Sequence, residues 1–371
     1  MSAQALLRSK YASAYRRWAG VGPYYAMFPI AFAERVIRQY TDVGGVVLDP
    51  FSGRGTAVFA AGANGRSGIG IEINPVGYVY TKAKLNPASH KTVERRITEL
   101  GENAWRHRKS AESLPPFFHR CYSQATREFL VTARSRLDWR SSTVDCTTMA
   151  LLLVHLHGKR TDSLSNQMRQ TKSLSPQYAV RWWDERELEP PDIDPVEFMK
   201  TKLKWRYAKG IPTLRPSRVY LADSVNLLPR LQTTLSALGA ENVKLLLTSP
   251  PYCGITNYHY DQWLRVWLLG GSPAPTTPSG PHQGKFVDRT KYRELLQKVF
   301  VASRKLLAED AVVYVRTDFR KVTLAATVDA LVAAFPDKRI QRRRRPLTGR
   351  TQTELFGGKS NRDGEVDIIL K

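Results

Sequence analysis

Two short apolar runs near the beginning of the chain are separated by a glycine loop and a segment of small residues. Residues 45–48 form a β-branched run that ends at Asp49-Pro50-Phe51, and a second apolar run covers residues 67–73. Between them lie the loop 52–56 and the small-residue segment 57–63, which we expect to be helical. A strand, a glycine loop, a helix and a second strand form the first βαβ unit of a doubly wound sheet.

The same pattern returns in the later part of the chain. Further runs typical of buried strands lie at residues 218–221, 243–247, 311–315 and 366–370. Apolar residues at helical spacing occur in the segments 28–40, 292–307 and 323–335. The sequence therefore predicts an α/β fold with a doubly wound, mostly parallel, Rossmann-like sheet.

Residues 85–217 interrupt this alternation. Their sequence is mostly polar and helical in pattern, with Ser/Thr/Gln-rich stretches such as 161–177 and no run typical of a buried strand. We therefore expect one sheet domain built from residues 1–84 and 218–371, with a largely helical region inserted at 85–217.

The composition adds a strong positive charge to this picture. The 371 residues include 57 Lys and Arg against 33 Asp and Glu, a formal net charge of +24, and 42% of the residues are hydrophobic. This hydrophobic fraction is sufficient for a folded core and argues against a disordered basic tail. Because a polyanion relieves the repulsion between excess positive charges most directly, nucleic acid is favoured as a partner.

The cysteines and the apolar segments exclude several classes of protein. Only three cysteines occur, far apart and without CxxC or Cys/His spacing, so we expect neither a disulfide framework nor a metal site. No apolar run approaches the roughly 18 residues that a membrane helix needs, and the N-terminus lacks the apolar stretch of a signal peptide. We expect a cytoplasmic protein without a membrane partner.

Acidic and glycine residues follow the predicted strands. Asp49 ends the first strand, Glu72 ends the second and Asp223 follows the third. The loop after Asp49 contains Gly53 and Gly55, which allow the backbone to approach a ligand closely. In an open parallel sheet, ligands bind outside the carboxyl ends of the strands, where a carboxylate can accept hydrogen bonds from a ribose diol. These residues predict a nucleotide-type cofactor site.

A fourth predicted strand runs into the sequence Thr248-Ser249-Pro250-Pro251-Tyr252. Two consecutive prolines remove two N–H donors and fix the backbone so that its carbonyl groups point outward. Ser249 Oγ and the Pro250 carbonyl can then accept hydrogen bonds from an NH2 group, while Tyr252 offers a flat face on which a base can stack. At a strand end beside a glycine-loop cofactor site, this loop is a highly specific signal.

These motifs resemble those of the S-adenosylmethionine-dependent DNA amino-methyltransferases, which methylate N4 of cytosine or N6 of adenine. LDPFSGRGT (48–56) is similar to motif I of that family and TSPPY (248–252) to motif IV. GPYYAMFPIAF (22–32) resembles motif X, GIEINP (70–75) motif II and YLADS (220–224) motif III. The target-recognition region of such enzymes usually follows motif III, whereas the insertion here precedes it.

The resemblance implies a Rossmann-like methyltransferase sheet and a role for each matching residue. Motif X closes over the methionyl end of S-adenosylmethionine, the acid of motif II holds the ribose, and the acid of motif III reaches the adenine amine. The residues implied in cofactor binding are Phe28, Pro29, Asp49, Pro50, Phe51, Gly53, Gly55, Thr56, Glu72, Ile73, Asn74 and Asp223. Those implied in catalysis are Ser249, Pro250, Pro251 and Tyr252.

Two clusters of basic residues predict contacts with DNA phosphates. The first cluster, inside the inserted region, consists of Lys200, Lys202, Lys204, Arg206 and Lys209. The second consists of Arg342, Arg343, Arg344 and Arg345. The alternative is that each cluster forms a solvated face, which is the usual position of a run of charges.

The sequence thus predicts a site-specific DNA methyltransferase of prokaryotic type. It would transfer a methyl group from S-adenosylmethionine to N4 of a cytosine flipped out of double-stranded DNA, with a cognate restriction endonuclease as a candidate partner. Ser249 favours cytosine, because family members with an acidic residue at this position are mostly adenine enzymes. The alternatives are an N6-adenine DNA methyltransferase, an RNA or protein-glutamine methyltransferase, and a catalytically silent nucleic-acid-binding module.

Overall fold

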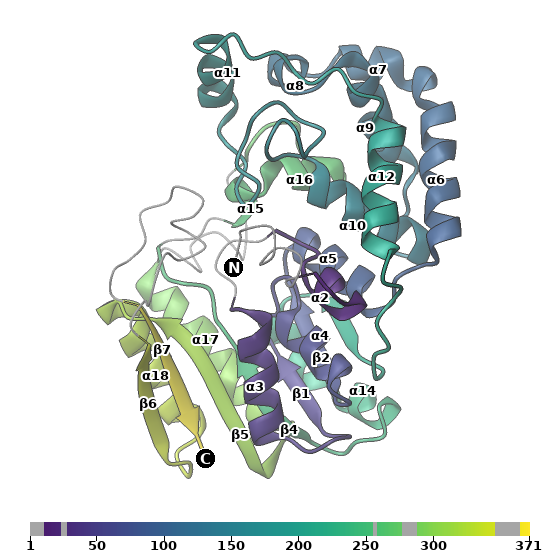
Figure 1. Cartoon of the computed structure of the whole chain (residues 1–371). Coiled ribbons are helices and arrows are strands. Elements are labelled where there is room, and N and C mark those ends of the chain that lie inside the picture. Colours follow the sequence, from purple (N-terminus) through teal and green to yellow (C-terminus); the bar gives the residue numbers. More distant parts are fainter. Residues whose placement is uncertain (1–10, 24–27, 255–257, 277–287, 346–363) are drawn as a thin grey trace, which may run out of the picture. The chain divides into compact units, whose positions relative to one another are not determined.

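The computed structural model describes most of the chain, namely residues 11–23, 28–254, 258–276, 288–345 and 364–371. The chain divides into two compact units, which are described separately (Figure 1). The sheet unit contains residues 25–81, 213–258 and 277–371. The helical unit contains residues 1–24, 82–212 and 259–276.

The sheet unit is built around seven strands in the described part of the chain, in the order β3-β2-β1-β4-β5-β7-β6. The strands are β1 Val46–Asp49, β2 Ser67–Glu72, β3 Arg218–Leu221, β4 Val243–Thr248, β5 Leu307–Asp318, β6 Ile340–Arg345 and β7 Glu365–Leu370. Strands β1 to β5 are parallel, whereas β7 is antiparallel to both β5 and β6. The predicted α/β fold with a doubly wound, mostly parallel sheet is confirmed.

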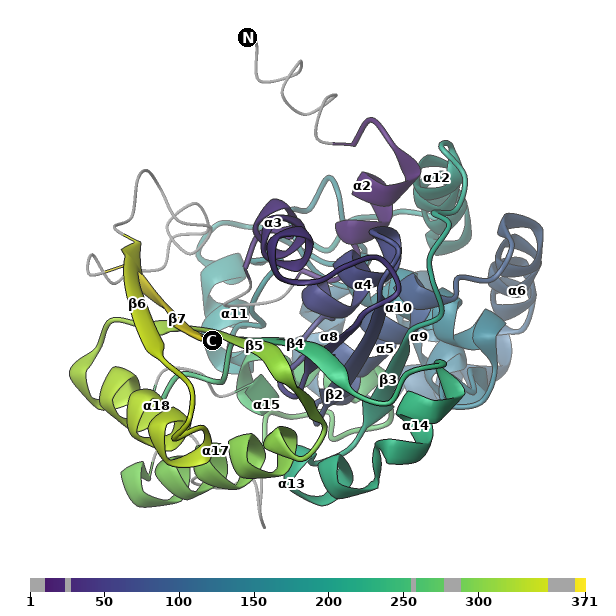
Figure 2. The ribbon, with the colours of Figure 1, turned by 90° about the horizontal axis from the view of Figure 1, so that it is seen from below.

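Helices cover both faces of this sheet (Figure 2). Helices α3 Ile30–Tyr40 and α4 Thr56–Ala63 pack on one face, where Val47 and Leu245 belong to their core. The other core contains Leu48 and Leu246. Its helices are α14 Gln232–Ala237, α17 Arg289–Arg304 and α18 Lys321–Ala334. Because side chains alternate between the faces of a strand, neighbouring apolar residues such as Val47 and Leu48 contribute to opposite cores.

Strand β6 is the element of the sheet that the sequence pattern did not predict. Its sequence, IQRRRR, contains no apolar run, and the strand lies at one edge of the sheet beside β7. The two strands pair antiparallel, with Ile340 opposite Leu370 and Arg345 opposite Glu365. An edge strand has one solvated side and tolerates charged residues. Residues 340–345 therefore form a strand because they pair with β7, and not because of their local sequence pattern.

The helical unit contains nearly all of the predicted insertion. Its helices are α2 Ala14–Ala19, α6 His90–Glu102, η1 Ala104–His107, α7 Arg108–Glu112, α8 Pro116–Cys121, α9 Gln124–Arg136, α10 Thr143–His155, α11 Pro176–Asp184, α12 Pro195–Tyr207 and α16 Trp263–Leu268. No helix in the described ranges has both the length and the apolar composition needed to cross a membrane.

The helical unit also includes residues 1–24 and 259–276, which the sequence analysis placed in the sheet domain. Two aromatic contacts illustrate why. The ring of Trp18 packs edge-on against Tyr207 at 5.1 Å, and that of Trp267 lies 4.5 Å from Phe118. These contacts join segments far apart in the sequence, and local pattern carries no signal for them.

Candidate active site

The candidate active site lies at the carboxyl ends of β1 and β4. The chain proceeds from β1 outward to β2 and β3, and β4 then returns to the other side of β1. In a doubly wound sheet, ligands bind at such a switch point. Thr248 Oγ1 donates a hydrogen bond of 2.6 Å to Asp49 Oδ1 and joins the two strand ends. The structure therefore brings the loops of motif I and motif IV together.

The loop after β1 depends on its glycines. Gly53 and Gly55 have φ angles of 53° and 74°, in the left-handed region that favours glycine. A Cβ on Gly55 would lie 2.3 Å from Cγ2 of Thr81, a residue of helix α5 Pro75–Leu85. The loop and this helix are therefore packed so closely that a side chain cannot be accommodated at residue 55.

Replacing Gly55 with valine is expected to lower the free energy of unfolding by roughly 2–5 kcal/mol, from left-handed strain and overpacking against Thr81. The matched control is Gly44→Val. Gly44 also has a left-handed φ, 91°, but a Cβ there would meet no atom within 4 Å. In urea unfolding, Gly44→Val should therefore lose only the part of the free energy that comes from left-handed backbone strain, and not the part that comes from overpacking. Equal losses in the two variants would show that contact with Thr81 does not constrain residue 55.

Glu72 joins the end of β2 to the same loop. Its Oε2 accepts the N–H of Gly53 at 2.6 Å, and its Oε1 accepts the N–H of Asn74 at 2.8 Å. Burial raises the pKa of Glu72 to about 8, opposed by these backbone hydrogen bonds and assisted by the charge of Asp49. Burial likewise raises the pKa of Asp49 to about 7, although the hydrogen bond from Thr248 opposes the shift. Two carboxyl groups with pKa values near neutrality thus lie at adjacent strand ends.

Two buried polar atoms beside these carboxyl groups have no hydrogen-bond partner within the described ranges. They are Ser52 Oγ and Asn74 Nδ2, on residues that are 6% and 1% exposed. A buried polar group without a partner costs about 1–3 kcal/mol, which a ligand that bonds to it offsets. Together with Glu72 and the left-handed glycines, these groups fit a cofactor that carries a ribose and polar substituents, such as S-adenosylmethionine.

Asp223 lies at the end of β3 and begins the short helix α13 Ser224–Leu227. Its Oδ1 accepts the N–H of Val225 at 3.0 Å as a helix cap. The backbone N–H of Ala222 donates to the carbonyl of Glu72 at 3.0 Å, which places Asp223 at the same edge as Glu72. The Asp223 carboxylate would therefore have to cap α13 and contact the adenine amine at the same time.

The remaining predicted cofactor residues lie on these same connections or before α3. Pro50 and Phe51 belong to the loop after β1, Thr56 begins α4, and Ile73 lies in the turn after β2. Phe28 is buried, and its ring lies 5.4 Å from that of Phe32, whereas Pro29 is the exposed residue that precedes α3. Residues 24–27 of the motif X segment lie outside the described residues.

The predicted catalytic loop continues directly from β4. Pro250 and Pro251 are buried, whereas Ser249 and Tyr252 are half-buried. Tyr252 Oη donates a hydrogen bond of 3.4 Å to Glu365 Oε1 on β7.

The residues that support this loop from β5 and β7 are not among those predicted from the sequence. Arg316 and Asp367 form a buried ion pair, with Nε and Oδ1 2.7 Å apart and exposed fractions of 6% and 0%. The signal in the sequence was a charged residue beside or within an apolar run of each strand, Arg316 directly after AVVYV and Asp367 within VDIIL. Charged residues are almost never buried unless they are paired, so such positions indicate a specific role.

Two lysines of the first basic cluster are paired with acids on the surface of the helical unit. Lys200 Nζ lies 3.0 Å from Glu197 Oε1. Lys202 forms an ion pair with Asp162. The sequence between residues 200 and 209 contains no acid, but folding supplies one to each of these lysines.

The other members of the cluster differ in exposure. Arg206 is 4% exposed, and its guanidinium donates a hydrogen bond to the carbonyl of Arg17. A buried guanidinium cannot reach a phosphate, so the structure does not support the predicted DNA contact of Arg206. Lys204 and Lys209 are exposed.

The second basic cluster lies on β6. Arg342 and Arg344 are exposed and Arg343 is half-buried. The guanidinium carbon of Arg344 lies 4.6 Å from the centre of the Phe319 ring. The side chain of Arg345 lies outside the described part of the structure.

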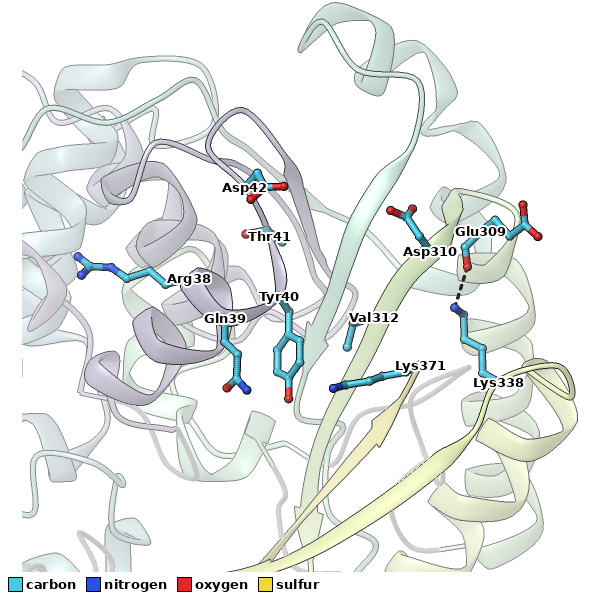
Figure 3. Close-up of a pocket in the computed structure, with 10 residues that line it drawn as sticks. All are labelled: Arg38, Gln39, Tyr40, Thr41, Asp42, Glu309, Asp310, Val312, Lys338 and Lys371. Carbon is cyan, nitrogen blue, oxygen red and sulfur yellow. Dashed lines mark hydrogen bonds between the residues drawn. The ribbon is translucent and has the colours of Figure 1, made fainter.

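A pocket of about 510 Å³ at another position in the sheet unit is shown in Figure 3. Its lining includes the end of α3, the first half of β5 and Lys371, whose Nζ lies 5.1 Å from the centre of the Tyr40 ring. It contains none of the residues predicted from the motifs. The candidate active site at the carboxyl ends of the strands is therefore separate from this pocket.

Comparison with known proteins gives a match over the part of the chain that contains the predicted motifs X, I and II. The sequence model of a DNA methylase family that covers N6 and N4 enzymes matches residues 6–82. Through this segment, the chain is similar to the DNA amino-methyltransferases. The matched segment contains the Gly53/Gly55 loop and Glu72, and members of this family generally depend on S-adenosylmethionine.

The curated relatives match over short segments. Type II methyltransferase M.MthZI of Methanothermobacter thermautotrophicus is 36% identical over 77 residues, 20% of this chain and 22% of the relative. Type II methyltransferase M.ScaI of Streptomyces caespitosus is 50% identical over 48 residues, 13% and 16% of the two chains. DNA adenine methyltransferase YhdJ of Escherichia coli is 41% identical over 66 residues, 18% and 22% of the two chains. The matches therefore span less than a quarter of each relative.

Among solved structures, the rRNA methyltransferase AviRa of Streptomyces viridochromogenes aligns over 95% of this chain and 89% of its own. The sequence identity is 12% and the TM-score 0.34. A likeness at this level says nothing about function, and the fold class follows from the strand order of the sheet.

Proposed function

We propose that this protein is a site-specific DNA methyltransferase that transfers a methyl group from S-adenosylmethionine to N4 of a cytosine flipped out of double-stranded DNA. The observation that carries the proposal is the hydrogen bond between Thr248 and Asp49, which holds the TSPPY loop beside the DPFSGRGT loop. The similarity of residues 6–82 to a DNA methylase family supports the same reaction. A cognate restriction endonuclease is a candidate partner.

The residues at the ends of β1, β2 and β3 would hold the cofactor. Glu72 would accept hydrogen bonds from the ribose hydroxyl groups, and Asp223 would reach the adenine amine. The left-handed Gly53 and Gly55 allow the backbone after β1 to approach the ligand closely. When bound, S-adenosylmethionine supplies a methyl group on a positively charged sulfonium.

The catalytic loop would act on the amine of the base. The lone pair of this amine is delocalised into the ring, so the amine is a poor nucleophile. Ser249 Oγ and the Pro250 carbonyl would accept hydrogen bonds from its N–H groups and favour a pyramidal nitrogen, while the Tyr252 ring would stack on the base. The contribution of the loop is therefore positioning and fixed dipoles. No thiolate is required, and Cys253 is 7% exposed, as expected for a packing residue.

The choice of cytosine over adenine rests on Ser249, the first residue of the loop. Adenine N6 is the second candidate, because a relative that is 41% identical over 66 residues is named a DNA adenine methyltransferase. Both bases present an NH2 group beside a ring nitrogen, so the same loop can hold either.

Mass spectrometry of nucleosides tests the proposal. The protein is incubated with unmethylated duplex DNA and S-adenosylmethionine, and the DNA is then digested to nucleosides. We expect N4-methylcytosine. N6-methyladenine as the sole modified nucleoside would overturn the choice of base but not the reaction. A protein that modifies RNA and leaves DNA unmodified would overturn the proposed substrate.

Binding to DNA is supported by a surface on α2, α12 and the turn that follows α12 in the helical unit, which we name the α2–α12 patch. It consists of Arg16, Arg17, Lys204, Trp205 and Lys209. The Arg17 guanidinium carbon lies 4.6 Å from the Trp205 ring centre, and Trp205 is 39% exposed. Arg16, Lys204 and Lys209 are exposed and form no ion pair within the described ranges. Exposed cations around an aromatic ring are typical of nucleic-acid contacts.

Neutralising Lys204 and Lys209 together is expected to reduce the salt dependence of DNA binding. Each lost phosphate contact reduces the magnitude of the negative slope of log K against log salt by about 0.9, so K204Q/K209Q should reduce this magnitude by about 1.8. The matched control is K200Q/K202Q on the same helix, because Lys200 and Lys202 are already paired with acids. Fluorescence anisotropy over a salt series gives both slopes. A K204Q/K209Q slope equal to that of wild type would place the α2–α12 patch outside the DNA interface.

A further inference from the structure

A continuous chain of side chains in the sheet unit links the proposed base site to the proposed cofactor site. Tyr252 Oη donates to Glu365 Oε1 at 3.4 Å, and Glu365 Oε2 lies 3.3 Å from Arg316 Nη1. On its other side, the Arg316 guanidinium carbon lies 3.5 Å from the centre of the Phe32 ring. The Phe32 ring in turn packs against Phe28 at 5.4 Å. Arg316 is the central residue of this chain.

Asp367 holds Arg316 in a fixed orientation. Arg316 Nε lies 2.7 Å from Asp367 Oδ1, and Nη2 lies 3.0 Å from Oδ2. Tyr314 Oη also donates to Asp367 Oδ2, at 2.8 Å. Because both ends of the pair are buried and the contact is bidentate, the guanidinium cannot rotate without losing two charge-assisted hydrogen bonds. Arg316 is therefore a rigid group with an edge toward Glu365 and a face toward Phe32.

We propose that Arg316 is a positioning residue that orients Tyr252, through Glu365, and the Phe28–Phe32 pair by direct stacking. The proposal rests on the proposed function, because it assigns Tyr252 to the base and Phe28 to the cofactor. One rigid guanidinium then sets the relative position of the two groups that contact the reactants. Misplacement of reacting groups by about 1 Å can cost about 10²-fold in rate, which explains why a buried charge is useful here.

The two sides of Arg316 can be tested separately. Replacing Arg316 itself would leave Asp367 buried without a counter-ion and destabilise the fold, so the test uses its outer partners. Glu365→Ala removes the link to Tyr252 and is expected to lower kcat roughly tenfold, with an unchanged Kd for S-adenosylmethionine. Phe32→Leu removes the ring that Arg316 covers and is expected to raise that Kd roughly three- to tenfold.

A double-mutant cycle distinguishes positioning from an independent structural role. If Glu365 acts through the Tyr252 hydroxyl, Y252F should lower kcat as E365A does, and E365A/Y252F should be no slower than either single variant. Glu365→Gln, which keeps an acceptor oxygen, should recover part of the rate. The matched control is Glu309→Ala, an exposed acid at the other end of β5, which should leave kcat and Kd unchanged. Wild-type kcat in E365A, multiplicative losses in the double variant, or an unchanged Kd in F32L would each overturn the inference.

The proposed function can fail without deciding this inference. A wild-type protein that transfers no methyl group to DNA overturns the proposed function. The contact between Tyr252 and Glu365 is then measured by urea unfolding of wild type, Y252F, E365A and the double variant. Non-additive free energies of unfolding are expected, and additive values would overturn the inference.

Discussion

Replacing Ser249 with alanine is expected to lower the rate of methyl transfer by about 10²-fold and to leave the affinity for S-adenosylmethionine unchanged. The hydroxyl oxygen would accept a hydrogen bond from the target amine, and this hydrogen bond would strengthen as the nitrogen becomes pyramidal in the transition state. An interaction made mainly in the transition state lowers kcat and not cofactor binding when it is removed. Single-turnover kinetics on duplex DNA and calorimetry with the cofactor alone separate the two quantities.

The matched control for this variant is Ser236→Ala, an exposed serine on α14 that should leave the rate unchanged. Tyr252→Ala is expected to lower turnover as well, because stacking of a base on an aromatic ring contributes about 1–3 kcal/mol. Full activity in both the Ser249 and the Tyr252 variant would contradict the role proposed for the loop. A parallel loss of cofactor affinity would instead indicate that the loop holds the cofactor.

The affinity for S-adenosylmethionine is expected to increase as the pH rises from about 6 to about 8. Burial raises the pKa of Glu72 to about 8, so its carboxyl group is mainly protonated in the free protein below that pH. Ribose hydroxyl groups donate to a carboxylate, so binding favours the ionised form and the Kd should fall by up to about tenfold per pH unit. Calorimetry across this range measures the effect. Glu72→Gln should bind more weakly and show a flatter dependence on pH.

The same raised pKa values predict the pH dependence of stability in the free protein. An acid whose pKa is higher in the folded state than in the unfolded state stabilises the fold when it is protonated. This contribution to the free energy of unfolding is complete below the pKa that the same acid has in the unfolded chain. For Asp49 and Glu72 it is lost as the pH rises through about 7 and about 8. Urea unfolding of wild type over this pH range should show this loss of stability.

For the cofactor affinity, a Kd for S-adenosylmethionine that is identical at pH 6 and pH 8 would contradict the role proposed for Glu72.

The strands at the centre of the sheet could be predicted because burial on both faces requires apolar runs, such as residues 245–247. The positions of Asp49 and Glu72 at strand ends then followed from the topology of a parallel sheet. The hydrogen bond between Thr248 and Asp49 could not be predicted, since it depends on β4 returning beside β1. The burial of Arg206 was equally invisible, because its partner Arg17 is 189 residues away in the sequence.

The arginines of β6 have a consequence for self-association. An edge strand exposes unpaired N–H and C=O groups, which can pair with the same strand of another molecule and begin aggregation. Arg342 and Arg344 are exposed on this edge, and a second copy of β6 would bring like charges against them. The electrostatic repulsion opposes such pairing, and it weakens as salt screens the charges. The protein should therefore stay monodisperse at low ionic strength and lose this protection as the salt concentration rises.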